Sequence, residues 1–121
     1  MNSLEQRRAT HAGRHATGLQ QRDVAKLPAL IINNGLLATA AFALGEKRGP
    51  MKVAMDALAG HLAGRGLIAM IESDNGKMVT PDTKEMIDDL AARPDALSLQ
   101  RATIEALAYL GYLKRFATPN E

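Results

Sequence analysis

Apolar and polar positions recur with a helical period in the first part of the chain. Small apolar residues follow one another at spacings of three, four and three, at Ala9, Ala12, Ala16 and Leu19. Residues with these spacings share one face of an α-helix, so the pattern predicts a first helix over residues 4–26, capped by Asn2 or Ser3. A different arc of that helix carries cationic and histidine side chains, namely Arg7, Arg8, His11, Arg14, His15, Arg22 and Lys26.

A second apolar stretch begins at Pro28, a residue suited to the first turn of a helix because that position needs no amide donor. Within this stretch, Asn33, Asn34 and Gly35 could instead form a hairpin turn between two short strands. The alanine-rich, uniformly apolar residues that follow do not alternate as a half-exposed strand does. We therefore expect a buried second helix, with Leu27 at its junction to the first helix and Gly35 allowing another helix to cross closely.

A third helix is predicted from Pro50, after a loop that carries Lys47 and Arg48 at its tip. The residues after Pro50 keep helical spacing in their apolar positions, at Met51, Ala54, Met55, Leu58 and Leu62. Polar residues and a glycine in the segment 72–79 are typical of a turn. The third helix is therefore expected to end before this turn.

Two further helices complete the predicted fold. Thr80, followed by a proline and an acidic residue, predicts an N-terminal cap for a short helix that runs to about Arg93. Ser98 is expected to cap the last helix, whose inward face carries Leu99, Ala102, Ala106, Leu107, Leu110, Leu113 and Phe116. The whole pattern predicts an all-α fold, a single compact bundle of about five helices in which residues 1–121 form one domain.

Composition agrees with this picture and restricts the chemistry. The chain has 121 residues, fewer than the roughly 150 of a typical domain, and 46% of them are hydrophobic. Aromatic residues make up only 3%, whereas alanine and leucine, which favour helices, are abundant. The lack of cysteine excludes disulfides and thiolate chemistry and fits a protein of the reducing cytoplasm. We find no secretory signal and no apolar run of about 18 residues, so no membrane segment is expected.

Charge is distributed unevenly along the chain, although the formal net charge is only +2. Residues 1–26 contain five Lys or Arg against two Asp or Glu, whereas residues 72–95 contain three against seven. We therefore expect one end of the molecule to attract a polyanion. The helix around Asp88 and Asp89 is expected to repel a polyanion or to meet a basic partner.

The sequence offers one candidate pair of metal ligands. His11 and His15 lie four residues apart, the spacing at which two imidazoles on one helical face can share a metal ion. A zinc-protease helix would also carry a glutamate between the histidines, and here Arg14 adds a cation instead. We therefore interpret the pair as part of a solvated face and expect no metal.

Other catalytic signatures are missing from the sequence. Asp88 and Asp89 are adjacent, so on a helix they point about 100° apart and do not form an acid–base pair. The chain contains neither a nucleophile elbow around a serine nor a glycine loop of the phosphate-binding type. We expect neither enzymatic activity nor a cofactor.

Two blocks of the sequence carry a family resemblance. These blocks are KLPALIINNGLLATAAFALGEK (Lys26–Lys47) and RATIEALAYLGYLKRFA (Arg101–Ala117). The chain resembles the small α-helical subunit of the type III-B CRISPR effector complex, the fifth Cmr protein. In that family Leu-Pro opens an apolar helix through Asn-Gly-Leu, and the last helix ends in Leu-Lys-Arg-Phe. The matching positions are Leu27, Pro28, Asn34, Gly35, Leu36, Leu113, Lys114, Arg115 and Phe116.

The resemblance implies a non-catalytic subunit of an antiviral, RNA-targeting complex. Proteins of this family look like small helical bundles that stack on further copies of themselves in an inner filament. The other Cmr effector subunits lie beside this filament, hold the guide RNA that pairs with target RNA, and perform the chemistry. The middle of this chain, residues 49–95, contains no motif of the family.

We expect the basic side chains to contact RNA phosphates without reading the bases. Lys26, Lys114 and Arg115 are the first candidates because they lie inside the matched blocks. Further candidates follow from charge and placement alone, and these are Arg7, Arg8, Arg14, Arg22, Lys47 and Arg48. A core or junction role is expected of five other residues in the matched blocks, Leu27, Pro28, Gly35, Leu36 and Phe116.

Two other functions stay open from the sequence. A small DNA-binding regulatory dimer would use a helix-turn-helix formed by the helices on either side of residues 45–49. A metal-dependent enzyme would use His11 and His15. The first alternative predicts sequence-specific binding of the isolated protein to duplex DNA, and the second predicts a bound metal.

Overall fold

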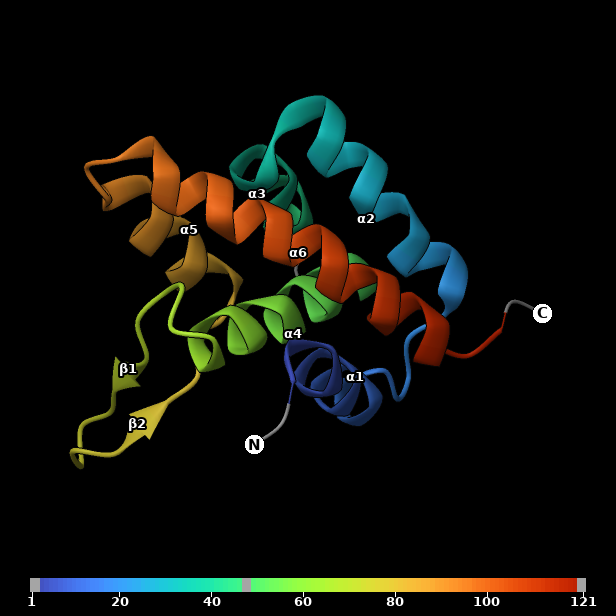
Figure 1. The fold of residues 1–121 in the computed structure, drawn as a ribbon, viewed down its shortest axis with the longest axis horizontal. Coiled ribbons are helices and arrows are strands. Elements are labelled where there is room, and N and C mark those ends of the chain that lie inside the picture. The colour runs from blue at the N-terminus through green and yellow to red at the C-terminus, as the bar shows by residue number, and fades with distance from the viewer. Residues whose placement is uncertain (1–2, 47–48, 120–121) are drawn as a thin grey trace.

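The computed structural model describes residues 3–46 and 49–119. Over these residues the chain forms six helices, which are α1 (Leu4–His15), α2 (Gln21–Asn34), α3 (Leu36–Gly45), α4 (Pro50–Gly64), α5 (Thr83–Ala92) and α6 (Ala96–Phe116). A short antiparallel hairpin projects from the bundle between α4 and α5, and its strands are β1 (Ile71–Glu72) and β2 (Met78–Val79) (Figure 1). The predicted all-α class is confirmed, with six described helices where the sequence pattern indicates five.

The last helix, α6, runs through the middle of the bundle, with α2 on one side and α1 and α4 on the other (Figure 1). Tyr109, Leu110 and Leu113 of α6 are fully buried and belong to one core with Leu58 and Leu62 of α4. Burying a leucine side chain of this kind contributes about 1.5–3 kcal/mol. This core holds α1 and α4 against the same stretch of α6.

The predicted first helix is too long. α1 ends at His15, and Gly18 adopts a left-handed conformation with φ 86°, which a right-handed helix cannot contain. The chain after Gly18 pairs with the C-terminal segment, because the N–H of Gln21 donates to the carbonyl of Thr118 over 2.9 Å and the N–H of Thr118 donates to that of Leu19 over 2.8 Å. A second helix therefore starts at Gln21, well before the predicted junction.

The expected roles of Pro28 and Gly35 are corrected by the structure. Pro28 lies inside α2 and does not open a helix. Gly35 lies between α2 and α3 with φ 92°, and its N–H donates to the carbonyl of Ile31 over 2.8 Å. Gly35 therefore separates two helices and does not serve as a crossing point within one. Leu27 and Leu36 are buried, as expected.

Aspartates, and not the predicted residues, cap two of the helices. α5 is capped by Asp82 and not by Thr80, and the Asp82 carboxylate accepts a backbone N–H of the first turn over 2.9 Å. α6 is capped by Asp95, which accepts the N–H of Ser98 over 2.8 Å, so Ser98 lies within the first turn. A carboxylate adds a favourable charge at the positive end of a helix, which a hydroxyl does not. The predicted cap of α1 by Ser3 is confirmed.

The last turn of α6 ends at the molecular surface. Phe116 is 51% exposed there, so the core or junction role expected for it is wrong. The inward position is instead taken by Ala117, which lies four residues after the buried Leu113 on the same face. None of the described helices is long and apolar enough to cross a membrane.

Candidate functional site

Side chains from α1, α4 and α6 form a polar network where these three helices meet. Glu105 of α6 accepts two hydrogen bonds from the guanidinium of Arg8 on α1, and both N···O distances are 2.8 Å. Nε2 of His61 on α4 lies 2.8 Å from the same carboxylate. Burial by itself would raise the pKa of Glu105, but the hydrogen bonds from Arg8 and His61 outweigh burial and hold that pKa below its usual range. Glu105 is therefore ionised at neutral pH and joins α1 and α4 to α6.

Aromatic contacts continue this network toward the surface. The ring of Tyr109 stacks on His61 with centroids 4.3 Å apart, and the Tyr109 hydroxyl is hydrogen-bonded to Nδ1 of His11 over 2.6 Å. Burial lowers the pKa of His11 to about 4, and the neighbouring cationic groups add to this effect. His11 is therefore neutral at pH 7.

A groove of about 410 Å³ opens between α1 and the end of α4, and we call it the basic groove. Arg7 and Arg14 are exposed and lie two turns apart on one face of α1. Among the described residues, no carboxylate lines the groove and neither arginine forms an ion pair. The lining of the basic groove includes Arg7, Thr10, His11, Arg14, Gly64 and Arg65. The basic groove therefore presents positive charge to solvent.

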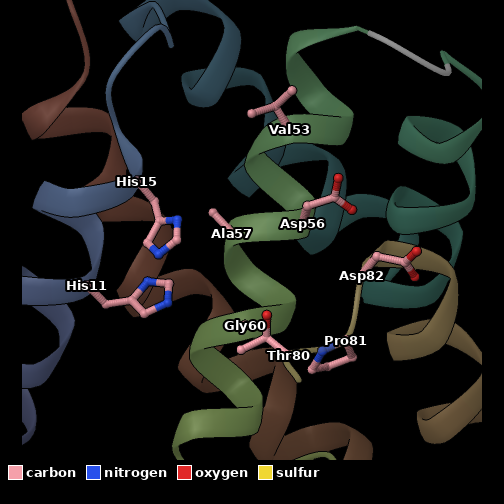
Figure 2. Close-up of a pocket in the computed structure, with 9 residues that line it drawn as sticks. All are labelled: His11, His15, Val53, Asp56, Ala57, Gly60, Thr80, Pro81 and Asp82. Carbon is pink, nitrogen blue, oxygen red and sulfur yellow. The ribbon is translucent and has the colours of Figure 1, made fainter. Parts of the chain in front are cut away.

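A second groove lies between α1, α4 and the segment that leads into α5 (Figure 2). The rings of His11 and His15 stack there with centroids 4.1 Å apart. Asp56 points from α4 toward the segment before α5 (Figure 2). It accepts two hydrogen bonds from Thr83, one from the N–H over 2.9 Å and one from the hydroxyl over 2.6 Å. In the part of the chain that the structure describes, no three His, Cys, Asp or Glu side chains are placed to hold a metal ion. His11 and His15 lie one helical turn apart on α1, and at this spacing their rings stack on each other.

The other sequence-derived RNA contacts lie outside the basic groove. Lys26 lines a separate depression between α2, α3 and the start of α4. Lys114 and Arg115 are exposed in the last turn of α6, and Arg22 is exposed in the first turn of α2. Outside the described residues lie Lys47 and Arg48. Of the predicted cations, the structure thus brings Arg7 and Arg14 together in one groove.

The sequence-derived set of contacts includes Arg8 and omits Arg65. The Arg8 guanidinium is bound to Glu105, so its role in this structure is to join α1 to α6. Arg65 follows directly after α4 and lines the basic groove. The sequence contains no local signal for Arg65, because the groove that it lines forms only where α1 lies against the end of α4.

Almost the whole chain matches one known family. The model of the family described as CRISPR-associated protein (Cas_Cmr5) matches residues 4–119. The chain belongs to this family. A search among curated proteins finds no match. The family match confirms the resemblance carried by Lys26–Lys47 and Arg101–Ala117, and it extends through the middle segment, where no motif of the family is apparent.

Membership in the Cas_Cmr5 family makes this chain a CRISPR-associated subunit, and it implies assembly with other Cas proteins in a Cmr complex. The geometry gives no support to the DNA-binding alternative. A helix-turn-helix across residues 45–49 needs an exposed recognition helix that can enter the major groove. α4 is buried along most of its length and leaves only Pro50, Val53 and Gly64 exposed.

Proposed function

We propose that this chain is a non-catalytic small subunit of a type III-B CRISPR (Cmr) ribonucleoprotein that acts in antiviral defence in the cytoplasm. The subunit stacks on further copies of itself in the inner filament of the complex. It contacts target RNA, paired with the guide RNA, through basic side chains of α1. The family match supports membership in the complex, and the basic groove is the observation on which the RNA contact rests.

Arg7 and Arg14 are the central RNA contacts in this proposal. Both side chains are exposed on one face of α1, and neither has an acidic partner within residues 3–46 and 49–119. Their charge is therefore free to neutralise phosphates, and each neutralised phosphate releases counterions. RNA affinity that depends on such contacts falls as the salt concentration rises.

Other cations add weaker contacts from outside the groove, and these are Arg22, Lys26, Lys114 and Arg115. One subunit has few such contacts and binds weakly by itself. Stacked copies place the same contacts along one RNA strand, which raises the affinity through effective concentration. Arg8 is left out of the proposal because its guanidinium is bound to Glu105.

The titratable groups near α1 support a non-catalytic role. His61 and Glu105 are buried and bound to each other, and His11 is hydrogen-bonded to the hydroxyl of Tyr109. Burial raises the pKa of Tyr109, so its hydroxyl stays protonated at neutral pH. Each of these groups is thus engaged in holding the helices together. We assign the cleavage and signalling chemistry to other subunits.

The proposal is tested by target-RNA capture in the assembled complex. We expect the double variant Arg7→Glu/Arg14→Glu to co-purify with companion Cas subunits and guide RNA, and to bind target RNA about tenfold more weakly or worse. The matched control Lys77→Glu/Arg101→Glu makes the same change in net charge at exposed positions outside the groove. This control should bind RNA normally.

Two results would count against the proposal. Equal RNA capture by both variants would remove the RNA-facing role of α1. Failure of the unaltered chain to co-purify with companion Cas subunits would remove the proposed place in the complex.

A further inference from the structure

The tip of the β1–β2 hairpin contains an Asn-Gly pair, Asn75–Gly76. Both residues are exposed, and Gly76 has a left-handed backbone with φ 82°. The N–H of Gly76 donates to the carbonyl of Ser73 over 2.9 Å, and the N–H of Lys77 donates to Oδ1 of Asn75 over 3.2 Å. A Cβ placed on Gly76 would meet no atom of the described residues within 4 Å. Solvent therefore reaches both the side-chain amide of Asn75 and the peptide bond that follows it.

The side-chain amide of Asn75 is adjacent in the chain to a nucleophile, the backbone nitrogen of Gly76. If this nitrogen gives up its proton to water, it can form a bond to Cγ of Asn75 and close a five-membered succinimide ring. The bond from Cγ to Nδ2 breaks, and Nδ2 leaves as ammonia with a proton from water. Glycine is the most favourable residue after the asparagine because it has no side chain to hinder the attack.

Water opens the succinimide ring at either of its two carbonyl carbons. Opening at Cγ breaks the new bond and leaves aspartate in a normal backbone. Opening at the backbone carbonyl carbon leaves isoaspartate, in which the chain continues through Cγ. The net reaction consumes water and releases ammonia in equal amounts, and it needs neither an oxidant nor a reductant.

We propose that Asn75 is a deamidation site, at which water converts the side chain to aspartate or isoaspartate through a succinimide formed with the nitrogen of Gly76. This inference goes beyond the proposed function and does not depend on it. The attack requires the N–H of Gly76 to leave the carbonyl of Ser73. The rate is therefore governed by how often the turn at the hairpin tip opens.

The hairpin holds this turn weakly. It projects from the bundle, and its strands pair through only two residues each, Ile71 with Val79 and Glu72 with Met78 (Figure 1). None of these four residues is buried. A two-stranded hairpin without a buried face is marginally stable in water. Opening of the tip therefore costs little free energy and leaves the helical core in place.

The second Asn-Gly pair of the chain, Asn34–Gly35, is held more firmly. The N–H of Gly35 donates to the carbonyl of Ile31 over 2.8 Å at the end of α2. The carbonyl of Gly35 accepts the N–H of Thr39 over 3.2 Å and its hydroxyl over 2.8 Å. Ile31 and Thr39 are each 2% exposed, so rotation of the Asn34–Gly35 peptide disturbs the core. Both pairs have the same intrinsic chemistry, and the structure makes Asn75 the more reactive.

The experiment follows deamidation of both pairs in the full chain, kept in mildly alkaline buffer and sampled over time by peptide mapping with mass spectrometry. Enzymatic methylation identifies isoaspartate, which direct hydrolysis of the side-chain amide does not produce. We expect both aspartate and isoaspartate at Asn75. They should form at least about tenfold faster than at Asn34, because the helical pair loses hydrogen bonds and buried contacts when it opens.

Urea provides a control within the same chain. Unfolding removes the structure around both pairs, so their rates in urea should agree within about twofold. The variant Asn75→Gln would have to close a larger ring, and it should form no product at this position while the rate at Asn34 stays unchanged.

Three results would overturn the site. Equal rates at Asn34 and Asn75 in the folded chain would show that the hairpin leaves Asn75 no freer than the helix leaves Asn34. Aspartate without isoaspartate would exclude the succinimide. No product at Asn75 in the folded chain, over a time in which the chain in urea reacts, would show that the turn protects the pair. The proposed function fails by a different result, that of Arg7→Glu/Arg14→Glu in the assembled complex.

Discussion

Arg8 and Glu105 join the first and last helices through a bidentate ion pair between residues 97 positions apart in the sequence. The exposed fraction of the side chain is 20% for Arg8 and 6% for Glu105. The cost of removing both charges from water offsets much of their attraction, but loss of one partner leaves the other charge buried and uncompensated. The pair therefore fixes how α1 lies on α6, and with it the direction in which Arg7 and Arg14 point.

Substitution Glu105→Ala should lower the free energy of unfolding by about 3–5 kcal/mol, because Arg8 and His61 lose their shared acceptor at a buried position. Glu72→Ala, at an exposed position of β1, serves as the control and should change it by less than about 0.5 kcal/mol. Urea denaturation followed by circular dichroism measures both values. Equal midpoints for the two variants would show that the network does not stabilise the fold.

The free energy of unfolding should fall as the pH drops from about 6.5 to about 5. Burial lowers the pKa of His11 to about 4 and that of His61 below its ordinary value, whereas histidine in the unfolded chain titrates near 6.5. The unfolded chain therefore binds more protons in this range, and protonation favours unfolding. Glu105 has a lowered pKa, so its own contribution is lost only at still lower pH.

Urea unfolding at a series of pH values measures this dependence. The slope of the free energy of unfolding against pH should be smaller in His11→Gln than in the unaltered protein. A free energy of unfolding that stays constant from pH 6.5 to pH 5 would contradict the burial of the two histidines as neutral rings.

Replacement by alanine should lower the stability of the protein at Gly35 and raise it at Gly111. Gly35 has φ 92°, and a Cβ placed there meets no atom within 4 Å, so the strain is purely conformational. Gly35→Ala should destabilise the protein by about 1–3 kcal/mol, because φ 92° with ψ 160° is a conformation that essentially only glycine adopts. Gly111 lies inside α6, where a Cβ also meets no atom within 4 Å, and Gly111→Ala should stabilise it by about 0.5–1 kcal/mol. Thermal unfolding compares the two variants, and a shift of the same sign in both would argue against a helix boundary at Gly35.

Local spacing was sufficient to predict the helical class and much of the core. Ala12, Leu58 and Leu110 are buried on the faces that the periodicity indicates. Helix boundaries were predicted less well where a distant partner determines them. The break after α1 depends on hydrogen bonds from Thr118 to Leu19 and from Gln21 to Thr118, which join segments far apart in the sequence, and no local pattern contains such bonds.

The candidate site was only partly visible in the sequence. Arg7 and Arg14 were predicted as RNA contacts from their charge and from their spacing, which places them on the face of the first helix that is not apolar. Arg8 has the same local signal as Arg7, and what distinguishes the two is Glu105 on another helix. Arg65 could not be assigned from the sequence because its groove exists only where α1 contacts α4.

The salt dependence of target-RNA affinity in the assembled complex tests the RNA-facing role of α1 most directly. The logarithm of the association constant falls linearly with the logarithm of salt concentration, by about 0.7–0.9 for each neutralised phosphate. Removal of two cations in Arg7→Gln/Arg14→Gln should reduce this slope by about 1.4–1.8, and Lys77→Gln/Arg101→Gln should leave it unchanged. The same slope in the unaltered complex and in the Arg7→Gln/Arg14→Gln complex would contradict an RNA contact through the basic groove.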